Sequence, residues 1–226
     1  MTDSEEGAKA WLRDVVGADA ETMERLDLLT HLLIVENDQQ NLVSRGTLPF
    51  VWQRHILDSA QLLTVPRETL PDGEWLDLGT GAGFPGLVIA VLQPDRQVSL
   101  VDSRRLRTDW LERAAQALGL GNARVELSRV EDLAERKYSV ISARAFAPLE
   151  KLLRISIRFS TPHTLWLLPK GAKALHEVES LAKNWRHTFH VEQSLTDPAA
   201  GIIAGHVAGM ENTARQRVSH RRKGRA

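Results

Sequence analysis

The chain has 226 residues, a formal net charge of zero and no cysteine. This length, with 42% apolar residues, is enough for one substantial core, or one core and a small accessory domain. The absence of cysteine excludes disulfides, thiolate metal sites and cysteine nucleophiles, and we expect no metal site. No apolar run approaches the ~18 residues of a membrane span, and the acidic N-terminus does not resemble a signal peptide. These features predict a cytoplasmic protein that does not bind a membrane.

The first part of the chain is predicted to be helical. Apolar side chains at helical spacing indicate helices over residues 5–16, from Asp19 onward and over residues 49–63. Asp19 is a candidate N-cap, and Leu26, Leu29, Leu33 and Ile34 are expected to line one face of the second helix. We therefore expect an N-terminal helical region over residues 1–70.

From residue 71 onward, short apolar segments alternate with helical patterns. Strands are predicted at residues 74–78, 97–101, 123–127, 138–142, 164–168, 188–193 and 202–207. Helices are predicted at residues 84–92, 104–118, 149–158 and 173–184. This alternation indicates an α/β fold with a Rossmann-like, mostly parallel twisted sheet covered by helices on both faces. The core is expected to span residues 71–210.

The last 16 residues, 211–226, form a basic tail. They carry six basic side chains and one acidic side chain, so the tail has a charge of +5 and the rest of the chain −5. Such a tail can bind a phosphate backbone, or it can be a solvated, flexible end. Its role stays open at this point.

The most informative segment runs from Asp77 to Gly86 and contains glycines at positions 79, 81, 83 and 86. It joins a predicted strand to a predicted helix, where glycine lets the backbone turn sharply and approach a ligand closely. Asp102 ends the next strand, where a carboxylate can accept both hydroxyl groups of a ribose. The pattern therefore predicts a cofactor that contains a nucleoside.

Two cofactors fit this loop, a nicotinamide dinucleotide and S-adenosylmethionine. Asp77 favours S-adenosylmethionine, because a carboxylate can hold its ammonium group but would repel a pyrophosphate. The acidic turn at residues 129–132 follows the third strand, where an adenine amino group could be recognised. An NAD-dependent oxidoreductase remains an alternative, although no catalytic tyrosine and lysine pair is evident. A non-catalytic RNA-binding protein with the same fold is a third possibility.

Five segments, taken together, resemble one protein family. They are NLVSR at residues 41–45, RHILDS at 54–59, DLGTGAGFPG at 77–86, SRVE at 128–131 and SARAFAP at 142–148. In order and spacing, from Asn41 to Gly171, the chain resembles the bacterial ribosomal RNA small-subunit methyltransferase G family. The resemblance implies that S-adenosylmethionine methylates the 7-nitrogen of one guanine in 16S ribosomal RNA, on free RNA or on an assembling small subunit. A methyltransferase acting on another RNA is the nearest alternative.

The resemblance and the glycine loop together imply roles for individual residues. The positions expected to bind the cofactor are Asp77, Gly79, Gly81, Gly83, Phe84, Asp102, Ser103, Val130, Glu131 and Arg144. Arg129, Arg144 and Lys170 are expected to orient the reacting groups, without a general base. Asn41, Arg45, Arg54 and His55 are expected to contact RNA. Arg54 and Asp58, four residues apart, could instead form a surface ion pair on one helix.

The chain departs from the family pattern just after Ser103. Many members have a lysine and an arginine there, whereas this chain has Arg104-Arg105-Leu106-Arg107, with leucine at the lysine position. The sequence leaves open which arginine replaces that lysine.

Overall fold

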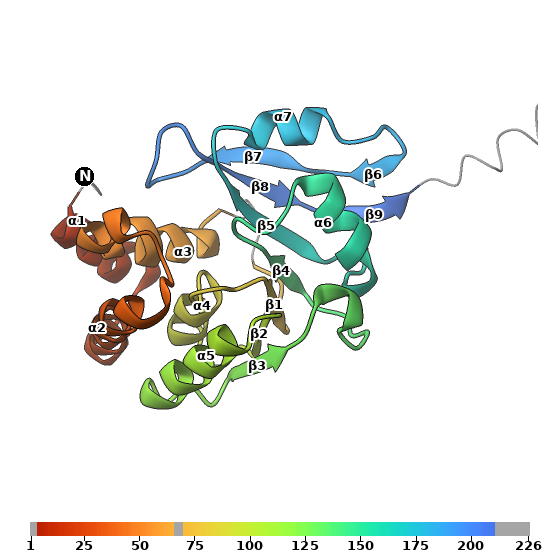
Figure 1. The fold of residues 1–226 in the computed structure, drawn as a ribbon. Coiled ribbons are helices and arrows are strands. Elements are labelled where there is room, and N and C mark those ends of the chain that lie inside the picture. The colour runs from red at the N-terminus through yellow and green to blue at the C-terminus, as the bar shows by residue number, and fades with distance from the viewer. Residues whose placement is uncertain (1–3, 66–69, 211–226) are drawn as a thin grey trace, which may run out of the picture.

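A seven-stranded sheet forms the centre of the molecule in the computed structural model, which describes residues 4–65 and 70–210 (Figure 1). Its strand order is β3-β2-β1-β4-β5-β8-β7. In chain order the strands are β1 (Trp75–Leu78), β2 (Val98–Asp102), β3 (Ala123–Leu127), β4 (Val140–Ser142), β5 (Leu165–Lys170), β7 (His190–Gln193) and β8 (Gly201–Gly205). Strands β1 to β5 pair in parallel, so the predicted Rossmann-like class is the observed one.

One edge of the sheet departs from the parallel arrangement. β8 runs antiparallel to both of its neighbours, β5 and β7. Residues 194–200 alone join β7 to β8, and a link this short makes a hairpin because a parallel crossover needs a dozen or more residues. We call residues 194–200 the hairpin loop.

Helices cover both faces of the sheet (Figure 1). α4 (Gly86–Leu92) and α5 (Arg105–Ala117) pack on one face. α6 (Leu149–Ser156), continued by η6 (Ile157–Phe159), and α7 (Ala174–Glu179) pack on the other. Side chains alternate along β1. Trp75 packs in the core under α4 and α5, whereas Leu76 and Leu78 pack in the core under α6 and α7.

The N-terminal residues form a helical layer that shares its apolar core with α4 and α5. Its elements are α1 (Glu5–Trp11), η1 (Leu12–Val16), α2 (Ala20–Gln40), η2 (Arg45–Phe50), η3 (Trp52–Leu57), α3 (Asp58–Ala60) and η4 (Gln61–Leu63). Asp19 caps α2 as predicted, since its side chain accepts a 2.8 Å hydrogen bond from the Thr22 amide. Ile34 was expected on the buried face and is 46% exposed, because the buried stripe continues from Leu33 to Asn37 instead.

Polar contacts also join this layer to the sheet domain. The guanidinium of Arg113 on α5 lies 2.8 Å from the Glu36 carboxylate on α2. Arg107, also on α5, donates a 2.7 Å hydrogen bond to the backbone carbonyl of Asn41. The sequence change at residue 70 therefore marks a change of secondary structure, while the packing continues across it.

Two short strands were missing from the sequence prediction. β6 (Trp185–His187) pairs antiparallel with β9 (Val207–Met210) in a separate two-stranded sheet. α7 accordingly ends at Glu179, before the predicted end at residue 184. The basic tail lies outside the described residues. Within residues 4–65 and 70–210, no helix has both the length and the apolar character of a membrane span.

Candidate active site

Two cavities adjoin at the carboxyl ends of the parallel strands, the edge where open α/β sheets bind ligands. The first, which we call the glycine-loop cavity, measures about 300 Å³ and lies beside Gly79, Asp102 and Glu131. The second, the arginine cavity, measures about 810 Å³ and is lined by residues that include Arg54 and Arg144. Ala145 and Phe146 line both cavities and separate them.

The glycines of the loop serve two different purposes. Gly79 and Gly81 adopt positive φ angles of 65° and 59°, and a Cβ atom added to Gly81 would meet no other protein atom closer than 3.8 Å. Gly81 is therefore needed for its backbone conformation and leaves open space above the loop. Gly83 also has a positive φ, but a Cβ there would collide with the side chain of Leu87. A side chain at position 83 would thus point into the core, and the expected contact of Gly83 with the cofactor stays a prediction.

Asp77 lies beneath the loop and is completely buried. Its Oδ1 accepts a 2.7 Å hydrogen bond from the Ser142 hydroxyl, and its Oδ2 accepts one of 3.0 Å from the Gly86 amide. Burial raises the pKa of Asp77 to about 6, although these hydrogen bonds act in the opposite direction. The carboxylate thus supports the loop from below. The expected contact of Asp77 with the ammonium group of S-adenosylmethionine stays a prediction.

Asp102 presents its carboxylate to the glycine-loop cavity, with only 4% of the residue exposed. It accepts backbone hydrogen bonds from Gly81 (3.1 Å) and Arg104 (2.9 Å), which fix its orientation. The guanidinium of Arg104 also contacts both oxygens, with Nε 3.1 Å from Oδ1 and Nη2 3.2 Å from Oδ2. The predicted ribose acceptor therefore lines this cavity, and an arginine contacts both of its oxygens.

The remaining wall of this cavity follows β2 and β3. Ser103 and Arg129 are exposed at its rim, together with Glu131, while Val130 is buried. Arg158 holds this turn from behind, because its guanidinium donates to the backbone carbonyls of Val130 (2.7 Å) and Glu131 (2.8 Å). The acidic turn therefore faces the same space as the glycine loop.

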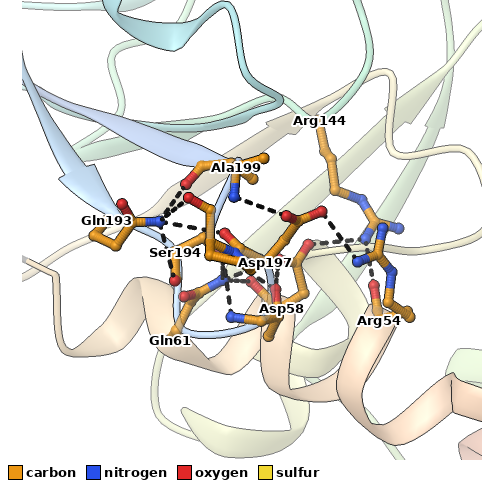
Figure 2. Close-up of polar contacts among 11 residues, drawn as sticks. Arg54, Asp58, Gln61, Arg144, Gln193, Ser194, Asp197 and Ala199 are labelled. Carbon is orange, nitrogen blue, oxygen red and sulfur yellow. Dashed lines mark hydrogen bonds and ion pairs between the residues drawn. The ribbon is translucent and has the colours of Figure 1, made fainter. Parts of the chain in front are cut away.

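Arg144 follows β4 and lies in the arginine cavity (Figure 2). Its Nη1 lies 3.1 Å from Oδ2 of Asp58, and its guanidinium lies over the Phe84 ring, 5.3 Å from the centroid. Phe84 is 2% exposed and stacks on His55 with centroids 5.1 Å apart. Arg144 lines the arginine cavity, and Phe84 packs against Arg144 and His55, so the expected contacts of both residues with the cofactor stay a prediction.

His55 contacts the same arginine. Its Nδ1 lies 3.3 Å from Arg144 Nη2, and its Nε2 lies 2.9 Å from Thr47 Oγ1. The Thr47 hydroxyl donates to the Ser44 carbonyl, so it accepts from His55 Nε2–H and leaves Nδ1 to accept from Arg144. Burial, and then the charges of Arg144 and Arg54, lower the pKa of His55 to about 3. This imidazole is neutral at any pH near 7.

Lys170 ends β5 and is nearly buried, with 10% of its side chain exposed. Its Nζ donates to the Ala147 carbonyl (2.7 Å) and lies 2.9 Å from Glu177 Oε2. The same Glu177 oxygen accepts a 2.7 Å hydrogen bond from the Leu149 amide. Lys170 therefore holds the segment that carries Arg144 and Phe146. A direct part in orienting the reacting groups stays a prediction.

Comparison with known proteins identifies the family. The family model described as rRNA small subunit methyltransferase G matches residues 22–201. A ribosomal RNA small subunit methyltransferase G from Novosphingobium aromaticivorans is 70% identical over 198 residues, which cover 88% of this chain and 86% of that protein. The corresponding protein of Erythrobacter litoralis is 54% identical over 206 residues, which cover 91% of this chain and 97% of that protein. The chain belongs to the rRNA small subunit methyltransferase G family.

Solved structures agree on the fold. TrmN from Thermus thermophilus matches with a TM-score of 0.55 at 20% identity, over 67% of this chain and 48% of that one. A variant of MtNAS in complex with S-adenosylmethionine matches with a TM-score of 0.53 at 14% identity, over 92% of this chain and 85% of that one. The predicted methyltransferase fold, family and S-adenosylmethionine cofactor are thereby confirmed, and the NAD-dependent alternative is not supported.

Within this methyltransferase, the residues predicted to contact RNA are divided between two places. Arg54 and His55 line the arginine cavity, whereas Asn41 and Arg45 are exposed outside it. Arg54 does not pair with Asp58 as the surface alternative assumed, because its Nη1 lies 3.3 Å from Asp197 Oδ2. Asp58 is instead the partner of Arg144.

Several residues of the site were missed by sequence reasoning. They are Arg104 on the ribose acceptor, Phe146 between the cavities, and Gln61, Thr196 and Asp197 around the two arginines. Of these, only Arg104 and Phe146 lie in or next to a recognisable motif. The hairpin loop has no sequence signal that would connect it to a helix about 140 residues earlier.

Proposed function

We propose that this methyltransferase acts on the 7-nitrogen of a guanine in 16S ribosomal RNA. Its substrate would be free RNA or an assembling small subunit in the cytoplasm. One observation carries the proposal: a cavity with the buried carboxylate of Asp102 adjoins, at one sheet edge, a larger cavity whose lining includes Arg54 and Arg144. The first suits the cofactor, and the second suits a polyanionic substrate.

The residues of the glycine-loop cavity fit S-adenosylmethionine. Asp102 would accept the ribose hydroxyls, and the turn at Val130 and Glu131 would contact the adenine. Gly81 leaves room for close approach, because a side chain there would project into open space, and Gly79 would contact the cofactor at a position where a Cβ atom would collide with Phe146. When bound, the cofactor supplies a methyl group on a sulfonium centre.

The arginine cavity would orient the guanine. The 7-nitrogen carries a free lone pair and no proton, so methyl transfer needs positioning and not a general base. Arg144 has a guanidinium suited to the oxygen beside that nitrogen or to a neighbouring phosphate. His55 does not compete as a base, because its Nδ1 lone pair faces Arg144 and its pKa is about 3.

The test combines mapping and kinetics. 7-Methylguanine in 16S ribosomal RNA is mapped with and without the gene, and in vitro with purified enzyme on free RNA and on small subunits. We expect Arg144→Ala to slow single-turnover methylation at saturating RNA while S-adenosylmethionine affinity is unchanged. Arg154→Ala is the control, because Arg154 pairs with Glu150 on the surface of α6. Methylation at another atom, or a wild-type rate for Arg144→Ala, would contradict the proposal.

A further inference from the structure

The hairpin loop reaches across the sheet edge to the helix that carries Asp58 (Figure 2). The Leu195 amide donates a 2.8 Å hydrogen bond to the side-chain carbonyl of Gln61, and the Gln61 amide group lies 3.3 Å from Ser194 Oγ. These bonds connect segments that are more than 130 residues apart in sequence. The loop is therefore part of the wall of the arginine cavity, as its lining residues Ser194, Thr196 and Asp197 indicate.

Asp58 is the junction between this loop and Arg144. Its Oδ2 accepts from Arg144 at 3.1 Å. Its Oδ1 accepts from the Thr196 hydroxyl at 2.8 Å and from the Gln61 amide group at 2.9 Å. Because each oxygen has its own donors, the carboxylate cannot rotate without breaking a hydrogen bond on the other side.

Internal hydrogen bonds hold the hairpin loop in one conformation. The side-chain amide of Gln193 lies 2.9 Å from the Ala200 carbonyl and 3.1 Å from that of Pro198. The Ala200 amide also donates to the Asp197 carbonyl at 3.0 Å. Thr196 is thus presented to Asp58 by a loop with its own internal hydrogen bonds.

We propose that Thr196 is a positioning residue for methyl transfer, acting through Asp58 to fix the guanidinium of Arg144. The inference rests on the function proposed for Arg144 and adds a residue from the other end of the chain. Arg144 also donates a longer hydrogen bond from Nη1 to the Arg54 carbonyl, at 3.3 Å, so a second acceptor can hold the guanidinium in a shifted position. Without the Thr196 hydroxyl, Oδ1 of Asp58 keeps the bond from the Gln61 amide group but loses the bond from the hairpin loop. The carboxylate and the arginine can then settle in a shifted arrangement, and catalysis by orientation is sensitive to displacements of about 1 Å.

The experiment compares Thr196→Val with Thr196→Ser. Valine keeps the shape but removes the donor, and we expect single-turnover methylation at saturating RNA to fall about tenfold. Serine keeps the hydroxyl and should restore most of the rate. Calorimetry should give the wild-type affinity for S-adenosylmethionine, and thermal unfolding should show that both variants fold. Thr161→Val is the matched control, because Thr161 is a partly buried loop threonine before the amino end of β5.

A double-mutant comparison separates this inference from the proposed function. In an Arg144→Ala background, Thr196→Val should add little further loss, since Thr196 acts through Asp58 on the guanidinium that is then absent. A wild-type rate for Thr196→Val, or an equal loss in both backgrounds, would overturn the role of Thr196 alone. A wild-type rate for Arg144→Ala would overturn both proposals together.

Discussion

Replacement of Arg104 by alanine is expected to tighten the binding of S-adenosylmethionine. The guanidinium of Arg104 contacts both oxygens of Asp102, which is the acceptor assigned to the ribose hydroxyls. A ligand that uses these oxygens has to displace the guanidinium first. In the alanine variant, the backbone amides of residues 81 and 104 still orient the carboxylate, so the acceptor remains in place while its competitor is removed.

The size of the gain follows from the exposure of the pair. The side chain of Arg104 is 60% exposed although that of Asp102 is 4% exposed. Ion pairs with an exposed partner are worth ~0–1 kcal/mol because water screens them. The dissociation constant should therefore fall about two- to fivefold, the upper end corresponding to about 1 kcal/mol.

The assay is calorimetric titration of S-adenosylmethionine and S-adenosylhomocysteine into wild type, Arg104→Ala and Arg105→Ala. Arg105 is the matched control, because it lies on the same helix and pairs with Asp109, away from the cavity. Its replacement should leave both affinities unchanged. If Arg104→Ala bound the cofactor with wild-type or weaker affinity, the guanidinium would not be a competitor, and weaker binding would indicate a direct contact with the cofactor.

Three further expectations concern acidic residues. Asp102→Ala should weaken S-adenosylmethionine binding by about 1.5–3 kcal/mol, the value of a charge-assisted hydrogen bond; an unchanged dissociation constant in calorimetry would remove Asp102 from the site. Asp197→Asn should strengthen RNA binding and steepen its salt dependence, because it frees Arg54 to contact a phosphate. A salt series of binding assays checks this, with Asp95→Asn in the exposed turn before β2 as control, and equal slopes would contradict it. Asp77 has a pKa raised to about 6 from 3.8, so folding favours its protonated form and its contribution to stability declines as pH rises from about 4 to above 6. The unfolding free energy of Asp77→Asn, relative to wild type, should therefore rise by about 3 kcal/mol across this window in denaturant titrations; a constant difference would show that the pKa is not raised.

The sequence predicted the parts of the site that are local in the chain. The glycine loop, Asp102 and the turn at Val130 each lie at or just after the end of a strand, and the carboxyl ends of parallel strands meet at one edge. Their common cavity therefore follows from the sequence pattern. The different purposes of Gly81 and Gly83 could not be predicted, because both have positive φ and only the tertiary surroundings distinguish open space from the side chain of Leu87.

The features that the sequence could not predict depend on contacts between segments that are distant in the chain. Arg54 and Asp58 have the spacing of a helical ion pair, which made them look like partners. In the fold, each instead pairs with a residue far along the chain, Arg54 with Asp197 and Asp58 with Arg144. The strand β8 overlaps the strand predicted at residues 202–207, but the sequence does not show the hairpin that makes it antiparallel to β7.

The protonation state of His55 decides whether the arginine cavity works by orientation alone. An imidazolium beside Arg144 would repel the guanidinium and would have no lone pair to accept its hydrogen bond, whereas a neutral ring accepts it at Nδ1. Burial and the two neighbouring arginines lower the pKa of His55 to about 3, so we expect its ring signals in NMR spectra to stay constant from pH 5 to pH 8. The signals are assigned by comparison with His55→Gln, and a histidine model compound in the same buffer gives the reference titration. A midpoint near 6.5 for His55 would mean that the ring takes up a proton next to Arg144. Positioning by a fixed guanidinium would then fail at mildly acidic pH, and the methylation rate would have to follow that titration.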